Sequence, residues 1–370
     1  MKFTCTQENL IKGLNIVSKI SSKNVSLPIL NNILISVNNE GVDLSATNLE
    51  IGIKTKIRSK TEQSGKITVP SQILTSFVSY LPEEKVEFET INNEIKITSG
   101  KWKTKIKTQP AEDYPLIPEV EKKQNFKIKS SVLKNALSQT IFAAINNESR
   151  PELSGGYFNI NQEKSELIVV ATDSYRLAEK KVEVLENIKN STNFIIPIKT
   201  LQELARILSE INENEEVNIF LEENQIMFKT DNIELTSRLI DGEYPDYKQI
   251  IPQNLQTSVE FSKNEIINAI KAAGLFAKIG VFDVIFEFKS PDKIIIKSTN
   301  TQIGENEAEI KAEIKGNNCK IVFNYHYILE GLLNIPQDKV VLELTSGENP
   351  AILKPQGKDD YLYLIMPIRQ

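Results

Sequence analysis

The segment FTCTQENLIKGL at residues 3–14 decides the fold of this chain, because its strand-then-helix pattern begins twice more. The pattern returns as FKIKSSVLKNAL at residues 126–137 and as VEFSKNEIINAI at residues 259–270. Matching apolar residues are Cys5, Ile128 and Phe261 in the strand and Leu10, Leu133 and Ile266 in the helix. Self-similarity at this interval predicts three copies of one structural unit.

The rest of each copy follows the same order. A strand ends on a small residue and Thr in LSATN, VVATD and IKSTN, where the threonines are Thr47, Thr172 and Thr299. A second strand-and-helix segment follows as TVPSQILTSFVSYL at 68–81, IIPIKTLQELARIL at 195–208 and IVFNYHYILEGLL at 321–333. A βαβββ-type unit is therefore expected about twice in each copy.

Two segments rich in Pro and acidic residues separate the copies: AEDYPLIP at 111–118 and DGEYPDYKQIIP at 241–252. Such composition is typical of exposed, extended linkers. We therefore expect three domains, at residues 1–121, 122–252 and 253–370. Each should be of the α+β class, with two helices packed on β-sheets.

The composition of the 370-residue chain argues against several classes of protein. No apolar run approaches the roughly 20 residues of a membrane-spanning helix, and MKFTCTQENL lacks the apolar segment of a signal peptide, so a cytoplasmic protein is expected. The two cysteines, Cys5 and Cys319, lie far apart and form no CxxC motif. We expect both to be small buried hydrophobic residues rather than ligands of a metal.

Catalysis is not indicated. The single histidine, His326, lies where a strand passes into a helix, with no nucleophile motif nearby, so we expect a surface or core histidine. Asp173 follows Thr at a strand end, where Asp more often fixes a turn. Phosphate-binding loops and paired-cysteine metal motifs do not occur, so no cofactor is expected. An enzyme of unknown type stays open as a minor alternative.

The charge is distributed unevenly. The formal net charge is -5, yet the first helix of each copy is cationic. Their charged residues are Lys12, Lys19 and Lys23; Lys134 and Arg150 against Glu148; and Lys271 and Lys278. Lys199 and Arg206 on a second helix add to them, offset by Glu203 and Glu210. If these helices face a common channel they would meet phosphates without reading bases; ordinary solvated helix faces are the alternative.

Three further segments carry a family resemblance. ATDSYRLA at 171–178, LIDGEYPDY at 239–247 and MPIR at 366–369, together with the threefold repeat, resemble the β subunit of bacterial DNA polymerase III, the replicative sliding clamp. The resemblance implies the DNA clamp fold and a head-to-tail homodimer, a closed ring of six domains with helices lining the hole. It implies a non-catalytic processivity factor that encircles duplex DNA of any sequence and tethers the polymerase, loaded by a separate clamp loader.

The resemblance also implies a subunit interface, in which Leu275 and Phe276 meet the strand around Ile106 of the next subunit. Helical projection supports this for Leu275, because the residue lies opposite Ile266 on an extended helix and would face solvent. The alternative is that Leu275 and Phe276 both belong to the core.

A cleft for partner peptides is implied as well. Its residues would be Leu153, Thr172, Ser174, Tyr175, Arg176, Leu177, Pro245, Gln249, Ile250, Asn324, Tyr327, Pro350, Leu364, Ile365, Met366, Pro367, Ile368 and Arg369. The side chains of Leu177, Ile250, Leu364 and Met366 could form an apolar pocket for a partner's Leu and Phe anchors. Arg176 and Arg369 would supply polar rims.

Three residues depart from the family pattern. Ser174 and Tyr175 stand where many members have Gly and His, and Gln249 stands where Arg is frequent, so the preference of the cleft is open. Without the resemblance, LYLIMPIR would be interpreted as an ordinary last strand. A β-rich interaction scaffold that never touches DNA is then a further alternative function, besides the enzyme of unknown type.

Overall fold

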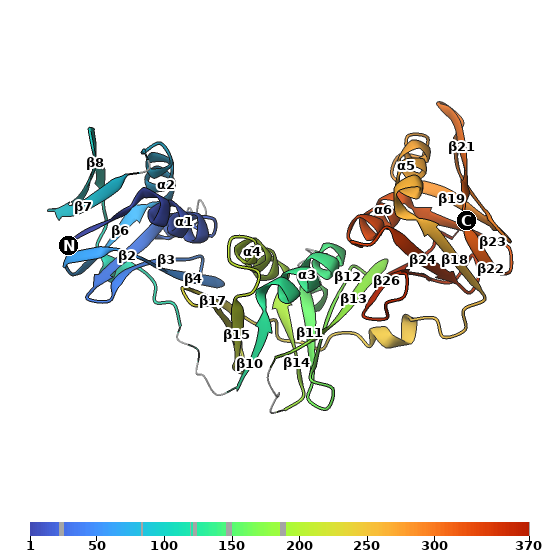
Figure 1. Ribbon diagram of the computed structural model, residues 1–370, viewed down its shortest axis with the longest axis horizontal. Helices are drawn as coiled ribbons and strands as arrows, with labels where there is room; N and C mark the ends of the chain where they lie inside the picture. Colours follow the sequence, from blue (N-terminus) through green and yellow to red (C-terminus); the bar gives the residue numbers. More distant parts are fainter. Residues whose placement is uncertain are drawn as a thin grey trace. The chain divides into compact units, whose positions relative to one another are not determined.

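A computed structural model describes residues 1–21, 26–82, 84–118, 120, 124–145, 150–185 and 190–369 (Figure 1). Lys23 and Glu148 lie outside the described residues. The first copy contains β1 (Lys2–Thr6), α1 (Gln7–Ser18), β2 (Asn32–Asn38), β3 (Gly41–Thr47), β4 (Ile51–Ile57), β5 (Lys60–Gln63), β6 (Gly65–Pro70), α2 (Ser71–Ser79), β7 (Lys85–Ile91), β8 (Glu94–Ser99) and β9 (Trp102–Lys107).

The other two copies repeat this order, except that no described strand of the second copy corresponds to β5. The second contains β10 (Gln124–Lys129), α3 (Ser130–Thr140), β11 (Gly155–Asn161), β12 (Glu166–Thr172), β13 (Arg176–Glu183), β14 (Thr192–Pro197), α4 (Ile198–Leu208), β15 (Glu216–Leu221), β16 (Gln225–Lys229) and β17 (Ile233–Arg238). The third contains β18 (Thr257–Ser262), α5 (Lys263–Gly274), β19 (Asp283–Lys289), β20 (Lys293–Asn300), β21 (Gly304–Lys311), β22 (Glu313–Gly316), β23 (Cys319–Asn324), α6 (Tyr325–Leu333), β24 (Lys339–Leu344), β25 (Ala351–Pro355) and β26 (Tyr361–Ile365). The expected βαβββ order, twice in each copy, is confirmed.

The first helix shows why the sequence folds in this way. Thr6 caps α1 by accepting a hydrogen bond on its hydroxyl from the Asn9 backbone N–H at 3.3 Å. Leu10, Leu14 and Val17 are fully buried at helical spacing, so one face of α1 packs into the core. The predicted row of cations is only partly present on α1, because the helix ends at Ser18 with Lys19 as its C-cap, and Lys12 forms an ion pair with Glu8.

The described residues form two compact units, Met1–Ser130 with Arg206–Leu239, and Ser131–Ala205 with Ile240–Gln370. The first unit holds a five-stranded sheet, β5-β1-β7-β8-β9, and an eight-stranded sheet, β10-β15-β16-β17-β4-β3-β2-β6. The second holds a nine-stranded sheet, β14-β11-β12-β13-β26-β25-β24-β18-β22, and a four-stranded sheet, β21-β20-β19-β23.

The two long sheets join one copy to the next. β4 of the first copy pairs antiparallel with β17 of the second, and β13 of the second pairs antiparallel with β26 of the third. We call these pairings the first and the second sheet junction. The compact units therefore follow the sheets rather than the repeats, and the division at residues 121 and 252 stays a prediction.

The two cysteines and the histidine differ in burial. Cys5 is buried, as expected, and burial raises the pKa of its thiol to about 12. Cys319 is only half-buried, because it begins β23 at the end of its sheet. His326 lies exposed in the first turn of α6, where its backbone N–H donates to the Asn324 side chain. Within the described ranges, no helix is long and apolar enough to cross a membrane.

Candidate functional site

The turn at residues 172–176 positions the center of the predicted cleft. The Thr172 hydroxyl donates to the carbonyl oxygen of Arg176 at 2.6 Å, and Asp173 Oδ1 accepts from the backbone N–H groups of Tyr175 and Arg176 at 2.9 and 3.0 Å. Thr47 and Asn48 make the same bonds in the first copy. The prediction that Asp173 fixes a turn is confirmed.

Arg176 is a buried hub. Only 9% of its surface is exposed, Nε donates to Asp173 Oδ2 at 3.0 Å, and the other two nitrogens donate to Glu330 and to the Phe142 carbonyl. Its guanidinium also lies over the Tyr327 ring, 4.8 Å from the ring centroid. The expectation that Arg176 is a polar rim is wrong, because its donors hold three chain segments together.

Beside this hub lies an apolar cluster at the second sheet junction. Val170, Leu177 and Leu364 are fully buried and pack with Tyr247, while the partly buried Met366 packs against this cluster. The Tyr247 hydroxyl donates to Glu179 Oε2 at 2.6 Å, which fixes the linker to the sheet. Burial and this bond to a carboxylate raise the pKa of Tyr247 well above its usual value.

Met366 connects the cluster to a surface pocket of about 490 Å³. Four predicted residues line this pocket: Gln249, Ile250, Pro350 and Met366. Ile250, which lines the pocket, leaves 42% of its surface exposed. Ile250, Ile251 and Met366 thus form an apolar part of this pocket beside the buried cluster, and the rest of the lining includes polar side chains.

The predicted cleft residues differ widely in exposure. Buried are Leu153, Thr172, Arg176, Leu177, Leu364 and Ile365; partly buried are Asn324, Tyr327, Pro350, Met366, Pro367 and Ile368; exposed are Ser174, Tyr175, Pro245, Gln249, Ile250 and Arg369. Sequence reasoning missed Phe142, Glu179, Tyr247 and Glu330. The motif GEYPDY contains Tyr247, so its aromatic residues could have suggested a packing role; nothing in the sequence indicates the other three.

Ser174 adopts a left-handed backbone conformation with φ of +77°, which glycine adopts without steric cost. We expect Ser174→Gly to raise the free energy of unfolding by about 0.5 to 1 kcal/mol, measured by urea denaturation. Ser174→Ala is the matched control: it also removes the hydroxyl that accepts from Arg150 at 3.4 Å, but it keeps the Cβ. Equal stability of both variants would contradict backbone strain at this residue.

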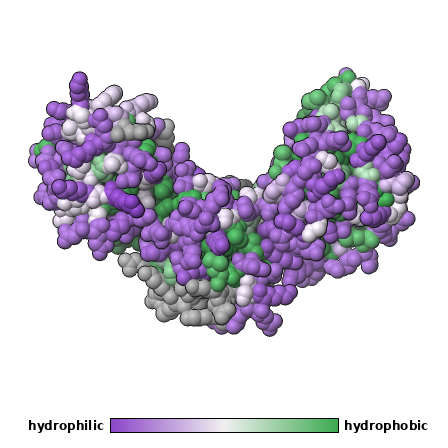
Figure 2. Space-filling view, in the orientation of Figure 1, coloured by the Kyte–Doolittle hydropathy of each residue, from purple (hydrophilic) through white to green (hydrophobic). Residues whose placement is uncertain are grey.

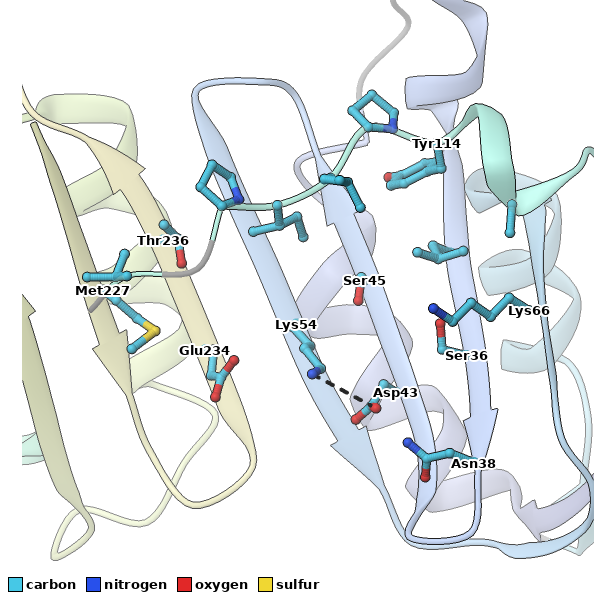
Figure 3. Close-up of a pocket in the computed structure, with 17 residues that line it drawn as sticks. Ser36, Asn38, Asp43, Ser45, Lys54, Lys66, Tyr114, Met227, Glu234 and Thr236 are labelled. Atoms are coloured by element: carbon cyan, nitrogen blue, oxygen red, sulfur yellow. Dashed lines mark ion pairs between the residues drawn. The ribbon is translucent and has the colours of Figure 1, made fainter. Parts of the chain in front are cut away.

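The first sheet junction offers a contrasting pocket of about 600 Å³ (Figure 3). When the copies are aligned, its Ser45, Lys54 and Thr236 are the counterparts of Val170, Glu179 and Leu364. Lys54 forms an ion pair with Asp43 at 4.0 Å, drawn as a dashed line in Figure 3. Gly52, the counterpart of Leu177, lies under the chain's own Ile117, whose Cγ2 would be 2.6 Å from a Cβ at that glycine. The lining of this pocket combines charged and polar side chains with apolar ones such as Ile117 and Met227. At the second junction, in contrast, the counterpart positions hold the buried apolar cluster.

The predicted cations have varied environments. Lys19, Lys199, Lys271 and Lys278 are exposed, and Lys134 is partly buried. Lys12 forms an exposed ion pair with Glu8 at 2.7 Å, Arg150 pairs with Glu152 at 3.2 Å, and Arg206 donates to the Ile16 carbonyl at 2.7 Å. Arg206 thus has a structural bond at the end of α1 besides any role in binding.

The predicted interface residues differ in exposure. At the end with α5 and β21, Leu275 is 75% and Ile279 is 90% exposed, and Figure 2 shows apolar surface there. Phe276 is partly buried. Ile106 is buried on β9, the edge strand of the five-stranded sheet. Leu275 therefore does not belong to the core of the single chain.

Comparisons with known proteins cover the whole chain. Family models of the DNA polymerase III beta subunit match as its N-terminal domain at residues 1–118, its central domain at 127–246 and its C-terminal domain at 248–369. The beta sliding clamp of Staphylococcus aureus (strain Mu50) is 34% identical over 380 residues, covering 100% of this chain and 99% of the relative.

Solved structures agree. The DNA polymerase sliding clamp from Bacillus subtilis matches with a TM-score of 0.94 and 32% identity, covering 100% of this chain and 99% of that one. A sliding clamp from Pseudomonas aeruginosa bound to griselimycin matches with a TM-score of 0.95 and 28% identity, covering 100% of both chains. The similarity extends over the full length of each of these proteins.

Proposed function

The chain belongs to the DNA polymerase III beta subunit family, and on this premise we propose how its three domains, at 1–121, 122–252 and 253–370, work as a replicative sliding clamp. Two copies close head to tail into a ring around duplex DNA. The ring catalyses no reaction; it tethers the polymerase to its template. The ring would act on the chromosome during replication, and it would therefore be located in the cytoplasm of a bacterial cell.

The free edges of β9 and β21 carry the ring proposal. Phe3 and Phe126 occupy the same position in the first and second copies. When the paired residues are followed from strand to strand, starting from each of these two, Thr104 on β9 and Leu235 on β17 occupy equivalent positions. In the same way, Asn306 on β21 is the counterpart of Ile53 on β4. Since β17 and β4 are paired within the chain, β9 of one copy should pair with β21 of another.

The register of that pairing follows from the first sheet junction, where Leu235 lies opposite Ile53. Transferred to the edges, it places Lys105 opposite Glu305 and Lys103 opposite Glu307. These four side chains are exposed in the single chain. Opposite charges directly across an antiparallel pair stabilise it, so the edges are complementary in charge as well as in backbone geometry.

The same register also brings the predicted apolar interface residues of the two copies together. Ile106 would lie opposite Gly304 of the second copy, and a Cβ at Gly304 would be 3.7 Å from the Phe276 ring. Ile106 and Phe276 would therefore come into contact over the glycine. Leu275 would be covered in the same step, which accounts for its exposure in the single chain.

DNA binding would be weak and independent of sequence. The cations Lys12, Lys19, Lys23, Lys134, Arg150, Lys199, Arg206, Lys271 and Lys278 are the candidates for contacts with phosphates. Lys12 and Arg150 already form ion pairs with Glu8 and Glu152, which lowers the effective positive charge. A modest cationic lining favours sliding over tight binding.

Partner proteins would bind at the second sheet junction. The pocket beside Ile250 and Met366 is the proposed seat of the apolar anchors of a peptide from the polymerase or the clamp loader. Tyr175, Gln249 and Arg369 would then contact the flanks of the peptide from their exposed positions. At the first junction the chain's own Ile117 covers Gly52, and Lys54 and Asp43 form an ion pair in the pocket, so the same anchors would find less free apolar surface there.

The ring is tested by loading the protein onto nicked circular DNA with a clamp loader and ATP, then linearising the circle. We expect the protein to stay on circles and to leave from the ends of linear DNA, which gel filtration of the DNA fraction measures. A linear molecule with both ends blocked by bound protein is the control and should retain the clamp. Equal retention on circular and open linear DNA would support the scaffold alternative instead.

A further inference from the structure

We propose that the pocket of about 600 Å³ at the first sheet junction is a binding site for a small aromatic carboxylic acid. Sites for small ligands commonly enclose about 300 to 1,000 Å³, so the size suits a molecule of one or two rings. The pocket lies between β2, β3 and β4 of the first copy, β16 and β17 of the second, and the linker at 111–118 (Figure 3). It is separate from the proposed peptide cleft, and its occupation does not depend on ring closure.

The linker of the first copy lacks an aromatic ring that the linker of the second copy has. In the second copy the Tyr157 ring stacks on Tyr244 with centroids 4.8 Å apart, and Tyr247 meets Tyr157 edge to face with centroids 6.4 Å apart. The dipeptide YP aligns Tyr114 with Tyr244, and it places Ile117 at the position of Tyr247. The first linker therefore keeps one tyrosine of this cluster and replaces the other by a shorter side chain.

The floor of the pocket is built from smaller side chains as well. Strand pairing makes Leu34 the counterpart of Tyr157 and Ser45 the counterpart of Val170. Tyr114 thus lines the pocket without either of the aromatic neighbours that the second copy provides (Figure 3). An aromatic ligand would occupy the space that the second copy fills with its own rings, and it would give Tyr114 the aromatic contact that it lacks.

A cation replaces the carboxylate that holds the ring in the second copy. The Tyr247 hydroxyl donates to Glu179, and the counterpart of Glu179 is Lys54. A ligand in the first pocket should therefore present an acceptor to Lys54. The ion pair between Lys54 and Asp43 is 4.0 Å long, and 48% of the Lys54 side chain is exposed. Such a pair is weak, so the ammonium group can bind a carboxylate of the ligand.

The surrounding charges favour an anionic ligand over a cationic one. The lining holds Lys54 and Lys66 against Asp43 and Glu234, which sums to zero. Glu234 is already bonded to Lys229, which adds +1 to the surroundings. A bound carboxylate brings this sum back to zero, whereas a bound ammonium group would raise it to +2. Attraction between opposite charges therefore selects the acid.

The test titrates the full-length protein with naphthalene-2-acetate and, separately, with naphthalene-2-acetamide, and follows the ligand signals by NMR. The amide keeps the rings and removes the charge. We expect the acid to bind with a millimolar or lower dissociation constant, about two- to fivefold more tightly than the amide. Lys54→Gln should remove this preference. Lys60→Gln, which makes the same change of charge on β5, should keep it.

A second pair of variants places the ligand in the chain. Ile117→Tyr supplies the ring that the second copy has, so it should fill the pocket and abolish binding of the acid. Ile117→Leu keeps the volume of the side chain and should bind the acid as the unmodified protein does. Melting temperatures show whether each variant is folded. Leu34→Tyr, which supplies the other missing ring, takes the place of Ile117→Tyr if that variant does not fold.

The outcomes decide the site. Equal binding of acid and amide, no binding of the acid at about 10 mM, or a preference that survives Lys54→Gln overturns the proposal. Binding of the acid that persists in a folded filling variant places the ligand elsewhere, for example beside Met366, and overturns it as well. Loss of the preference in Lys54→Gln, together with loss of binding in the filling variant, supports the proposal.

Discussion

Reversing both charges of the β9 edge, in Lys103→Glu with Lys105→Glu, is expected to convert the dimer into monomers at micromolar concentration. Each reversed pair loses an attraction and gains a repulsion, about 1 kcal/mol together. Two interfaces with two pairs each then give about 4 kcal/mol, so the dissociation constant should rise roughly a thousandfold. Sedimentation equilibrium measures it, and the effect should shrink in high salt.

Rescue by the opposite reversal identifies the partner strand. Glu305→Lys with Glu307→Lys should also be monomeric. In a mixture of the two variants, a mixed dimer of the head-to-tail ring has two different interfaces. At one, glutamates on β9 face lysines on β21; at the other, the original lysines on β9 face the original glutamates on β21. Mixed dimers should therefore form. The control is Lys2→Glu with Lys85→Glu, which changes the net charge by the same amount but lies on the inner strands β1 and β7. Dimers that resist both edge reversals would contradict the proposed register.

Replacing the buried hub, Arg176→Ala, is expected to lower the free energy of unfolding by about 3 kcal/mol. The substitution leaves the Asp173 carboxylate, 10% exposed, without its cation and removes the donor to the Phe142 carbonyl. Glu330 is 44% exposed and can regain water, so we expect the lower end of the range for a broken buried pair. Urea denaturation measures the change.

Arg150→Ala is the matched control for this prediction. Arg150 forms an exposed ion pair with Glu152, and its loss should cost less than about 0.5 kcal/mol. Arg176→Lys should be intermediate, because a single ammonium group cannot reach three acceptors in the geometry of a guanidinium. A loss below 1 kcal/mol in Arg176→Ala would mean that the hub is not needed for stability, and Arg176 would again be a candidate for peptide contact.

The sequence alone determined the elements and their repetition. Apolar spacing in residues 3–14 set a strand and a helix, and the small-Thr endings at Thr47 and Thr172 set equivalent turns. These features depend on neighbouring residues, whose periodicity is readable in one dimension. The family resemblance came from short motifs in a fixed order, and it supplied the ring and the cleft that periodicity could not.

Tertiary structure alone decided which residues meet. The Arg176 hub depends on Phe142 and Glu330, which lie 34 and 154 residues away in sequence, so no local pattern could show that this arginine is buried. The pairing of β4 with β17 and the free edges of β9 and β21 likewise follow from long-range strand order. Local sequence fixes backbone preference and the direction of apolar faces, whereas burial and pairing depend on the surfaces that distant segments present to each other.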